Sequence, residues 1–73
     1  MKEQPIKSEG QIVDVLPNGE FRVETVEGVF TCYLNGKMRM NKIKVIIGDR
    51  VNIELPPKFN IKFDKGRITF RNK

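Results

Sequence analysis

Four cationic side chains lie within eight positions of the segment GKMRMNKIKV, which spans residues 36–45. The segment contains no Asp or Glu, so none of these charges has an acidic neighbour within it. Like charges on adjacent turns of a helix repel one another by about 0.2–0.5 kcal/mol, and a bound polyanion turns this cost into attraction. The pattern therefore predicts contacts with phosphate groups. The four cations are Lys37, Arg39, Lys42 and Lys44.

The distribution of charge over the whole chain indicates the same chemistry. The 73 residues carry a formal net charge of +5. Residues 1–34 hold three basic and six acidic side chains, a balance of −3, and residues 35–73 hold eleven and three, a balance of +8. Such asymmetry favours a polyanionic partner, with nucleic acid as the first candidate and an anionic membrane as the second.

Export and membrane insertion are not expected for this sequence. No stretch approaches the ~20 apolar residues of a membrane span, and residues 1–10 lack the apolar run of a signal peptide. A single cysteine, Cys32, excludes an internal disulfide and suits a reducing compartment. We therefore expect a protein that acts inside the cell and does not enter a membrane.

The residue types that catalysis or metal binding would need are scarce. The chain has no histidine and one serine, Ser8, and its carboxylates follow the pattern of a solvated surface. Cys32 shares a strand face with Phe30 and Leu34, and apolar surroundings raise the pKa of a thiol, which makes it inert. We expect no catalytic residue, no metal site and no cofactor, and hence a protein that is not an enzyme.

Strand-forming residues dominate the chain. Fifteen Val and Ile residues against three Leu and no Ala favour strands over helices, because β-branched side chains suit a pleated surface. Pro17-Asn18-Gly19 marks a tight reversal after the first strand. The expected strands are residues 10–16, 20–26, 29–34, 50–55 and 66–71.

Alternation along these strands predicts which side chains are buried. Tyr33 is the outward ring on a strand, and Phe59 and Phe63 lie in the loop before the last strand. The predicted core residues are Phe21, Val23, Phe30, Cys32, Leu34, Val51, Ile53, Leu55, Ile68 and Phe70. Arg67, Thr69 and Arg71 take the outward phase of the last strand.

Five short strands with a helical turn between the third and the fourth predict an all-β, five-stranded OB-fold barrel. The nearest alternative is an SH3-like barrel, which the position of the helical turn makes less suitable. We expect one domain over residues 1–73, with residues 1–7 and 72–73 flexible.

The segment 36–45 is expected to combine a helical turn with extended chain. Asn35 is an acceptable N-cap for a turn over residues 37–41, and residues 42–45 then alternate as extended chain. We expect Met38 and Ile43 to close the open end of the barrel, and Met40 to be partly exposed.

The candidate binding surface is basic and poor in aromatic residues. Single-strand binding uses exposed rings for stacking, so the small supply favours recognition of a folded RNA by charge and shape. The predicted RNA-binding residues are Lys37, Arg39, Lys42, Lys44, Arg67, Arg71 and Tyr33, and Lys58, Lys62, Lys65 and Lys73 could extend the same surface.

Four blocks in the chain resemble a known family. "LPNGEFRV" (16–23), "GKMRMN" (36–41), "GDRVNIEL" (48–55) and "KGRITFR" (65–71) are similar, in the same order, to bacterial and plastid translation initiation factor one. The resemblance implies an OB-fold protein without catalytic activity that binds small-subunit ribosomal RNA at the decoding (A) site. It also implies contact with the neighbouring ribosomal protein, cooperation with initiation factors two and three, and a free monomer in a bacterial cytoplasm or an organelle stroma.

The resemblance carries over to individual positions. The basic rRNA-facing residues of the family correspond to Lys37, Arg39, Lys44, Arg67 and Arg71. The sequence departs from the family at Met40, where many members are basic, at Lys42, where many are aromatic, and in a longer loop over residues 56–65.

Two other functions remain open from the residues alone. A cold-shock-type RNA chaperone would bind unstructured single strands, and a structural barrel would use its basic half to dock an acidic protein partner. Binding to purified small subunits, compared with free oligonucleotides, distinguishes these possibilities.

Overall fold

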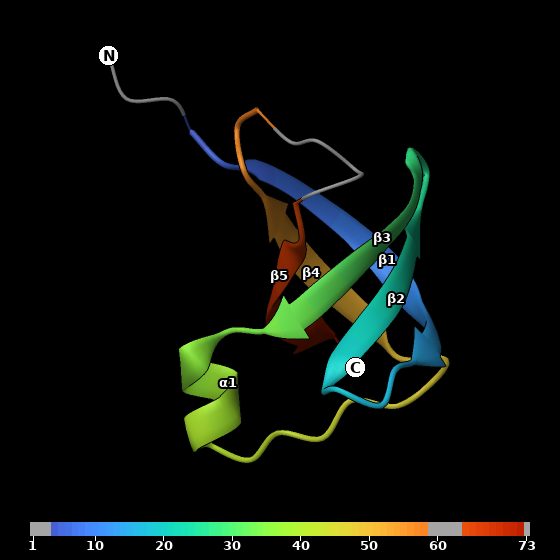
Figure 1. The fold of residues 1–73 in the computed structure, drawn as a ribbon, viewed down its shortest axis with the longest axis vertical. Coiled ribbons are helices and arrows are strands. Elements are labelled where there is room, and N and C mark those ends of the chain that lie inside the picture. The colour runs from blue at the N-terminus through green and yellow to red at the C-terminus, as the bar shows by residue number, and fades with distance from the viewer. Residues whose placement is uncertain (1–3, 59–63, 73) are drawn as a thin grey trace.

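The computed structural model describes residues 4–58 and 64–72, and within them five strands close a barrel in the order β1-β2-β3-β5-β4 (Figure 1). A short helix connects β3 to β4. This arrangement confirms the predicted five-stranded OB-fold. The elements are β1 (Ile6–Val15), β2 (Glu20–Thr25), β3 (Gly28–Leu34), α1 (Gly36–Met40), β4 (Arg50–Leu55) and β5 (Gly66–Asn72).

The long first strand closes the barrel because it pairs with two neighbours. Its first half, from Ile6 to Gln11, pairs antiparallel with β4, and its second half pairs antiparallel with β2. The strand therefore begins at Ile6, four residues before the predicted start, since β4 supplies hydrogen bonds that the local sequence does not indicate. Among the pairs of the described strands, β3 and β5 form the parallel one.

Two glycines in the barrel lie where strands approach one another closely. Gly10 lies on β1 near the point where pairing with β4 ends and pairing with β2 begins. A Cβ atom at this position would lie 2.4 Å from the carbonyl oxygen of Glu24. A Cβ at Gly66 would lie 2.8 Å from the Sγ atom of Cys32. Glycine is therefore needed at both positions because a Cβ atom would not fit, and not because of an unusual backbone conformation.

Most of the predicted core is confirmed. Met38 from α1 is buried and Ile43 packs against the core, so the expected closure of the barrel end is also confirmed. Leu34 is only partly buried. The buried apolar residues of the described chain are Ile12, Phe21, Val23, Phe30, Cys32, Met38, Val45, Val51, Ile53, Leu55 and Ile68.

One part of the core prediction is wrong, and a β-bulge explains the error. In the β4–β5 ladder Asn52 pairs with Phe70 while Ile53 pairs with Ile68, so Thr69 is an extra residue on β5. An extra residue shifts the alternation of everything beyond it. Phe70 is consequently 59% exposed instead of buried. Arg71 pairs with the buried Val51 and takes the inward phase at the barrel end, not the predicted outward one.

No helix among residues 4–58 and 64–72 has the length and the hydropathy that crossing a bilayer requires.

Candidate nucleic-acid interface

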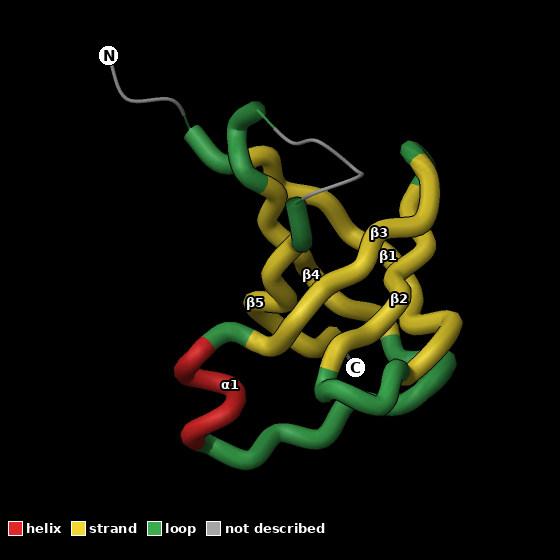
Figure 2. The backbone as a smooth tube through the Cα atoms, in the orientation of Figure 1, coloured by secondary structure: helices red, strands yellow, loops and turns green. Residues whose placement is uncertain are grey.

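The helix of the basic segment is capped by Asn35, as the sequence predicts. The Oδ1 atom of Asn35 accepts a hydrogen bond from the amide of Met38 at 2.8 Å. The amide of Asn35 donates to the carbonyl oxygen of Ile68 at 3.0 Å, which ties the start of α1 to β5. We call residues 36–45 the basic insert. It projects from one end of the barrel as α1 and the chain that follows it (Figure 2).

The helix ends in a Schellman motif, and this motif sets the backbone conformation of the next cation, Lys42. The amide of Ile43 donates to the carbonyl oxygen of Met38 at 3.1 Å, and the amide of Lys42 donates to that of Arg39 at 3.2 Å. Lys42 has a φ of 54°, a left-handed conformation that usually selects glycine at this position and costs other residues about 1–2 kcal/mol. The expected extended chain therefore does not begin at Lys42.

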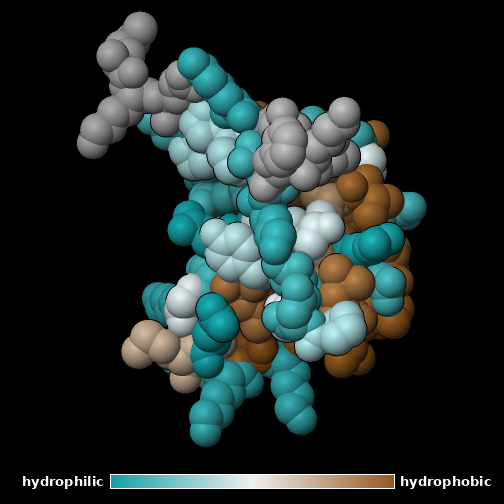
Figure 3. All heavy atoms as spheres, in the orientation of Figure 1, coloured by the Kyte–Doolittle hydropathy of each residue, from teal (hydrophilic) through white to brown (hydrophobic). Residues whose placement is uncertain are grey.

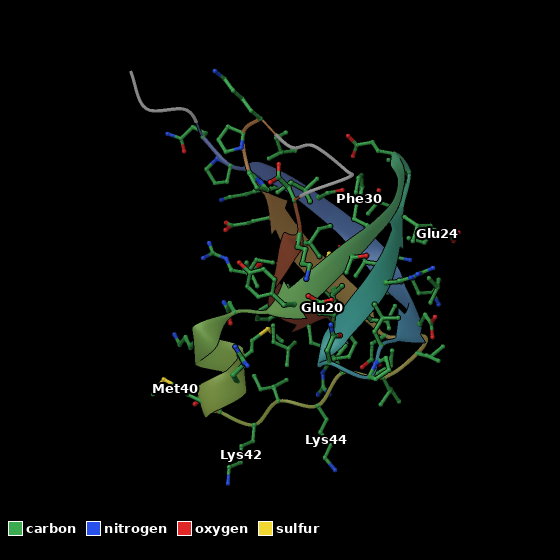
Figure 4. The ribbon with its side chains drawn as sticks, viewed as in Figure 1. Glu20, Glu24, Phe30, Met40, Lys42 and Lys44 are labelled. Carbon is green, nitrogen blue, oxygen red and sulfur yellow. The ribbon has the colours of Figure 1, made fainter. Side chains whose placement is uncertain are left out.

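The four cations of the basic insert are solvent-exposed, and they have no ion pair with any residue that the structure describes. Within the described part of the chain, none of Lys37, Arg39, Lys42 and Lys44 lies within ion-pairing distance of a carboxylate. The first turn of α1 has no acidic residue. Lys42 and Lys44 point away from the barrel, whereas Glu24 lies towards the opposite end of β2 (Figure 4).

Three cations on or beside the strands are in a different state, because each is paired with a carboxylate. The Arg50 guanidinium lies 3.1 Å from Glu9, and that of Arg67 lies 2.7 Å from Glu54. The hydrogen bond from Arg67 to Glu54 raises the pKa of the guanidinium. The Lys65 ammonium pairs with Glu20, and this hydrogen bond lowers the pKa of the Glu20 carboxyl. The basic insert thus carries four cations without an ion pair in the described chain, whereas Lys7, Arg22 and Arg71 are spread over three strands.

Arg71, on β5, forms a hydrogen bond with the backbone of the basic insert. Its Nη1 atom donates to the carbonyl oxygen of Lys44 at 2.7 Å. The side chain, which is partly buried, therefore holds the backbone that carries Lys44 in place. This contact gives Arg71 a structural role beside the RNA contact predicted for it.

Tyr33 and Arg67 lie together on the wall of the barrel. They are register partners on the parallel strands β3 and β5, and Tyr33 is 41% exposed. Tyr33 also lines a hollow of about 340 Å³ with Arg39. The structure therefore connects these two predicted residues to the basic insert, although the charge of Arg67 is already paired.

A second hollow, of about 330 Å³, separates α1 from the end of β5. Its residues include Phe70, Asn35 and Asn41, none of which belongs to the binding surface predicted from the sequence. Strand alternation places Phe70 in the core, and only the bulge at Thr69 exposes it. The lining residues are Asn35, Lys37, Met38, Asn41, Ile43, Thr69, Phe70 and Arg71.

The surface is divided between cationic and apolar areas. Hydrophilic side chains project from the end that carries the basic insert, and an apolar area covers the side formed by β1 and β2 (Figure 3). Met40 is 84% exposed on α1, in keeping with the predicted exposure. Exposed aliphatic residues elsewhere include Val13, Val15, Val26, Val29, Ile46 and Ile47.

Part of the predicted surface, namely Phe59, Lys62, Phe63 and Lys73, lies outside the described residues. In the described chain, no three His, Cys, Asp or Glu side chains are arranged to hold a metal ion.

Buried Cys32 has the properties of a packing residue. Desolvation raises the pKa of its thiol to about 12, so the reactive thiolate is suppressed at neutral pH.

A closed five-stranded barrel with unpaired cations on the β3–β4 connection defines an OB-fold protein whose surface suits a polyanion. The model of the family described as Translation initiation factor 1A / IF-1 matches residues 1–73. The chain belongs to this family of translation initiation factors.

Solved structures agree with this assignment. The solution structure of translation initiation factor one from the Wolbachia endosymbiont strain TRS of Brugia malayi matches with a TM-score of 0.75 at 38% identity, covering 94% of this chain and 79% of that one. YjeQ from Thermotoga maritima matches with a TM-score of 0.72 at 28% identity, covering 93% of this chain and 23% of that one. YloQ, a circularly permuted GTPase, matches with a TM-score of 0.74 at 24% identity over 93% and 23% of the two chains, which shows a shared fold.

Proposed function

We propose that this translation initiation factor binds small-subunit ribosomal RNA at the decoding (A) site through its basic insert. The protein occupies that site during initiation without catalysing a reaction. Its partners are the ribosomal RNA, the neighbouring ribosomal protein and initiation factors two and three. It is a monomer when free and acts in the cytoplasm of a bacterial cell.

The observation that carries this proposal is the set of four unpaired cations on the basic insert. Ion pairs neutralise Arg50, Lys65 and Arg67, so the insert is where an anionic ligand gains most by binding. RNA phosphates supply that charge, and each contact releases counterions. The resemblance in sequence and the family assignment support ribosomal RNA as the particular polyanion.

A chemical footprint on purified small subunits tests the proposal. We expect saturable, stoichiometric binding, with protection confined to the decoding region. Diffuse protection, or equally tight binding to unstructured oligonucleotides, would contradict it and favour a cold-shock-type chaperone. Binding that survives complete nuclease digestion of the RNA would instead favour a protein partner.

A variant without the insert charges tests the role of the unpaired cations. Lys42 is changed to Gly, which suits its left-handed backbone, and the other three cations are changed to Ala. Each lost phosphate contact lowers the salt slope of binding by about 0.7–0.9, so we expect a decrease of about 3 in the slope of log K against log salt concentration. The measurement is affinity for small subunits at salt concentrations of about 50 to 200 mM.

A second variant with the same net charge is the control. Replacing Lys7, Arg22, Arg50 and Lys65 by Ala also removes four charges, so both variants have a formal charge of +5 − 4 = +1. We expect this variant to keep most of the slope, because two of its cations are already paired. Equal losses in the two variants would mean that only total charge matters, and would remove the basic insert from the proposal.

A further inference from the structure

We infer that Phe70 is a stacking site for an unpaired base of the RNA, and that the bulge at Thr69 serves to present this ring. The inference rests on the proposed RNA-binding function and adds the chemical group that the hollow beside α1 receives. It adds a sequence-tolerant aromatic contact beside the cations of the basic insert.

Phe70 differs from the other phenylalanines of the described chain. Phe21 and Phe30 are each 7% exposed in the core, whereas Phe70 is 59% exposed. A phenyl ring left in water forgoes the stabilisation that burial provides. Without Thr69 as an extra residue, Phe70 would continue the inward phase of Ile68. The bulge therefore moves an aromatic ring out of the core and onto the surface beside the basic insert.

Hydrogen bonds across the strands hold the bulge in place. The hydroxyl of Thr69 donates to the carbonyl oxygen of Asn52 at 3.3 Å. One residue beyond Arg71, the Nδ2 atom of Asn72 donates to Asn52 Oδ1 at 2.9 Å and to Glu9 Oε2 at 3.1 Å. The ring is thus carried by a strand that is fixed on both sides of it, so little conformational freedom is lost when a ligand binds.

The hollow beside the ring has the size and the polar groups that a nucleotide needs. Its volume of about 330 Å³ lies at the lower end of the range for small-ligand sites, roughly 300–1,000 Å³. The side chain of Asn41 forms no hydrogen bond within the described residues, and a carboxamide can both donate to and accept from a base edge. Met38 and Ile43 supply apolar walls.

The charges at the rim favour a base that belongs to a nucleic acid over an apolar protein side chain. Lys37, on the same hollow, is an unpaired cation in the described part of the chain, and Arg71 is a second cation there. A base brings a phosphate with it, whereas an apolar side chain would leave Lys37 without a counterion. Ring, amide and cation together suit one nucleotide.

The absence of tryptophan from the sequence allows a direct test. In Phe70→Trp the single indole is placed at the proposed stacking position. In the control, Met40→Trp, it is placed on α1 at a residue that is 84% exposed and does not line the hollow. The probes are an RNA hairpin with unpaired bases in an internal loop and a fully paired hairpin of equal length, and binding is followed independently by anisotropy of a dye on the RNA.

We expect the looped hairpin to quench Phe70→Trp by about twofold, as direct stacking does, and to leave Met40→Trp nearly unchanged. Replacing Phe70 by Leu should weaken binding of the looped hairpin roughly tenfold, while Phe70→Tyr should preserve it. A change of affinity that is equal for Leu and Tyr would overturn the inference, since both variants keep the bulk of the residue but only Tyr keeps a ring.

These experiments distinguish failure of the stacking site at Phe70 from failure of the proposed RNA-binding function. If anisotropy reports binding of the looped hairpin while Phe70→Trp is not quenched, the stacking site is wrong and the proposed RNA-binding function stands. If the unmodified protein binds neither hairpin nor small subunits, the proposed function itself is overturned.

Discussion

The strands and the basic insert differ in how many of their cations have an acidic partner. On or beside the strands, Arg50, Arg67 and Lys65 each lie against a carboxylate from another strand. On the basic insert, the cations have no such partner within the described chain, and one of them, Lys42, occupies a backbone conformation that glycine would adopt more easily. The difference indicates that the barrel is arranged for its own stability and the insert for a ligand.

The same contrast applies to apolar residues. The barrel encloses Phe21 and Phe30, whereas β5 departs from regular pairing next to the basic insert and leaves Phe70 in solvent. An unpaired cation and the exposed ring line the same hollow beside α1. Violations of local rules that gather in one place are typical of functional sites.

The largest effect should follow from adding one methyl group to the barrel. In Gly10→Ala the new Cβ would lie 2.4 Å from the Glu24 carbonyl oxygen and 2.7 Å from Val23, and neither strand can move without disturbing the barrel. We expect the free energy of unfolding to fall by about 3 kcal/mol, as measured by urea denaturation.

Gly36→Ala is the matched change in the basic insert. No atom lies within 4 Å of a Cβ at Gly36, and alanine favours a helix over glycine by roughly 0.5–1 kcal/mol. We expect unchanged or slightly higher stability. If the two alanines destabilise the protein equally, the barrel and the insert are not distinct in their packing.

A smaller effect is expected from the thiol inside the barrel. The folded state holds the pKa of Cys32 at about 12, above the ordinary value of 9.0, so the unfolded chain loses this proton first as pH rises. The stabilisation is therefore complete below about pH 9 and decreases above it, by about 1 kcal/mol between pH 9 and pH 10. The measurement is urea unfolding of the unmodified protein and of Cys32→Ala across this range.

The Cys32→Ala variant separates the thiol from the lysines, which titrate in both proteins. Its stability should decline less steeply with pH than that of the unmodified protein. Parallel profiles would show that Cys32 does not ionise differently in the two states, and that the barrel interior is less protected from solvent than its packing indicates.

The smallest effect distinguishes a single unpaired cation from a single paired one. Lys44→Ala should lower the salt slope of small-subunit binding by about 0.7–0.9, the effect of one phosphate contact. Arg67→Ala should lower it less, because Glu54 already balances the charge of Arg67. A larger effect for Arg67 would reverse the comparison and indicate that RNA displaces Glu54 from its partner.

The sequence predicted the parts of the fold that depend on neighbouring residues. Alternation along residues 50–55 matches β4, and Asn35 caps the helix as its side chain allows. Met38 is buried at the barrel end, as predicted. The prediction of the early half of β1 failed, because Ile6 and Lys7 are extended through pairing with β4, which is distant in the sequence.

The candidate site was predicted in part. The cations of the basic insert could be identified from their spacing and the lack of nearby acids, and their contact with RNA stays a prediction. The paired state of Arg67, the backbone contact of Arg71 and the exposure of Phe70 could not be identified. The contacts of Arg67 and Arg71 involve residues more than ten positions away in the sequence. The exposure of Phe70 depends on a bulge that the alternation of apolar and polar residues does not reveal.

By itself the sequence determined the type of fold, the location of excess positive charge and the absence of histidine. These properties depend on residue types and short-range periodicity, which act before the chain is compact. Only the tertiary structure decided which cations are neutralised and which ring reaches the solvent, because pairing across strands and a one-residue shift in register bring together side chains that the sequence keeps apart.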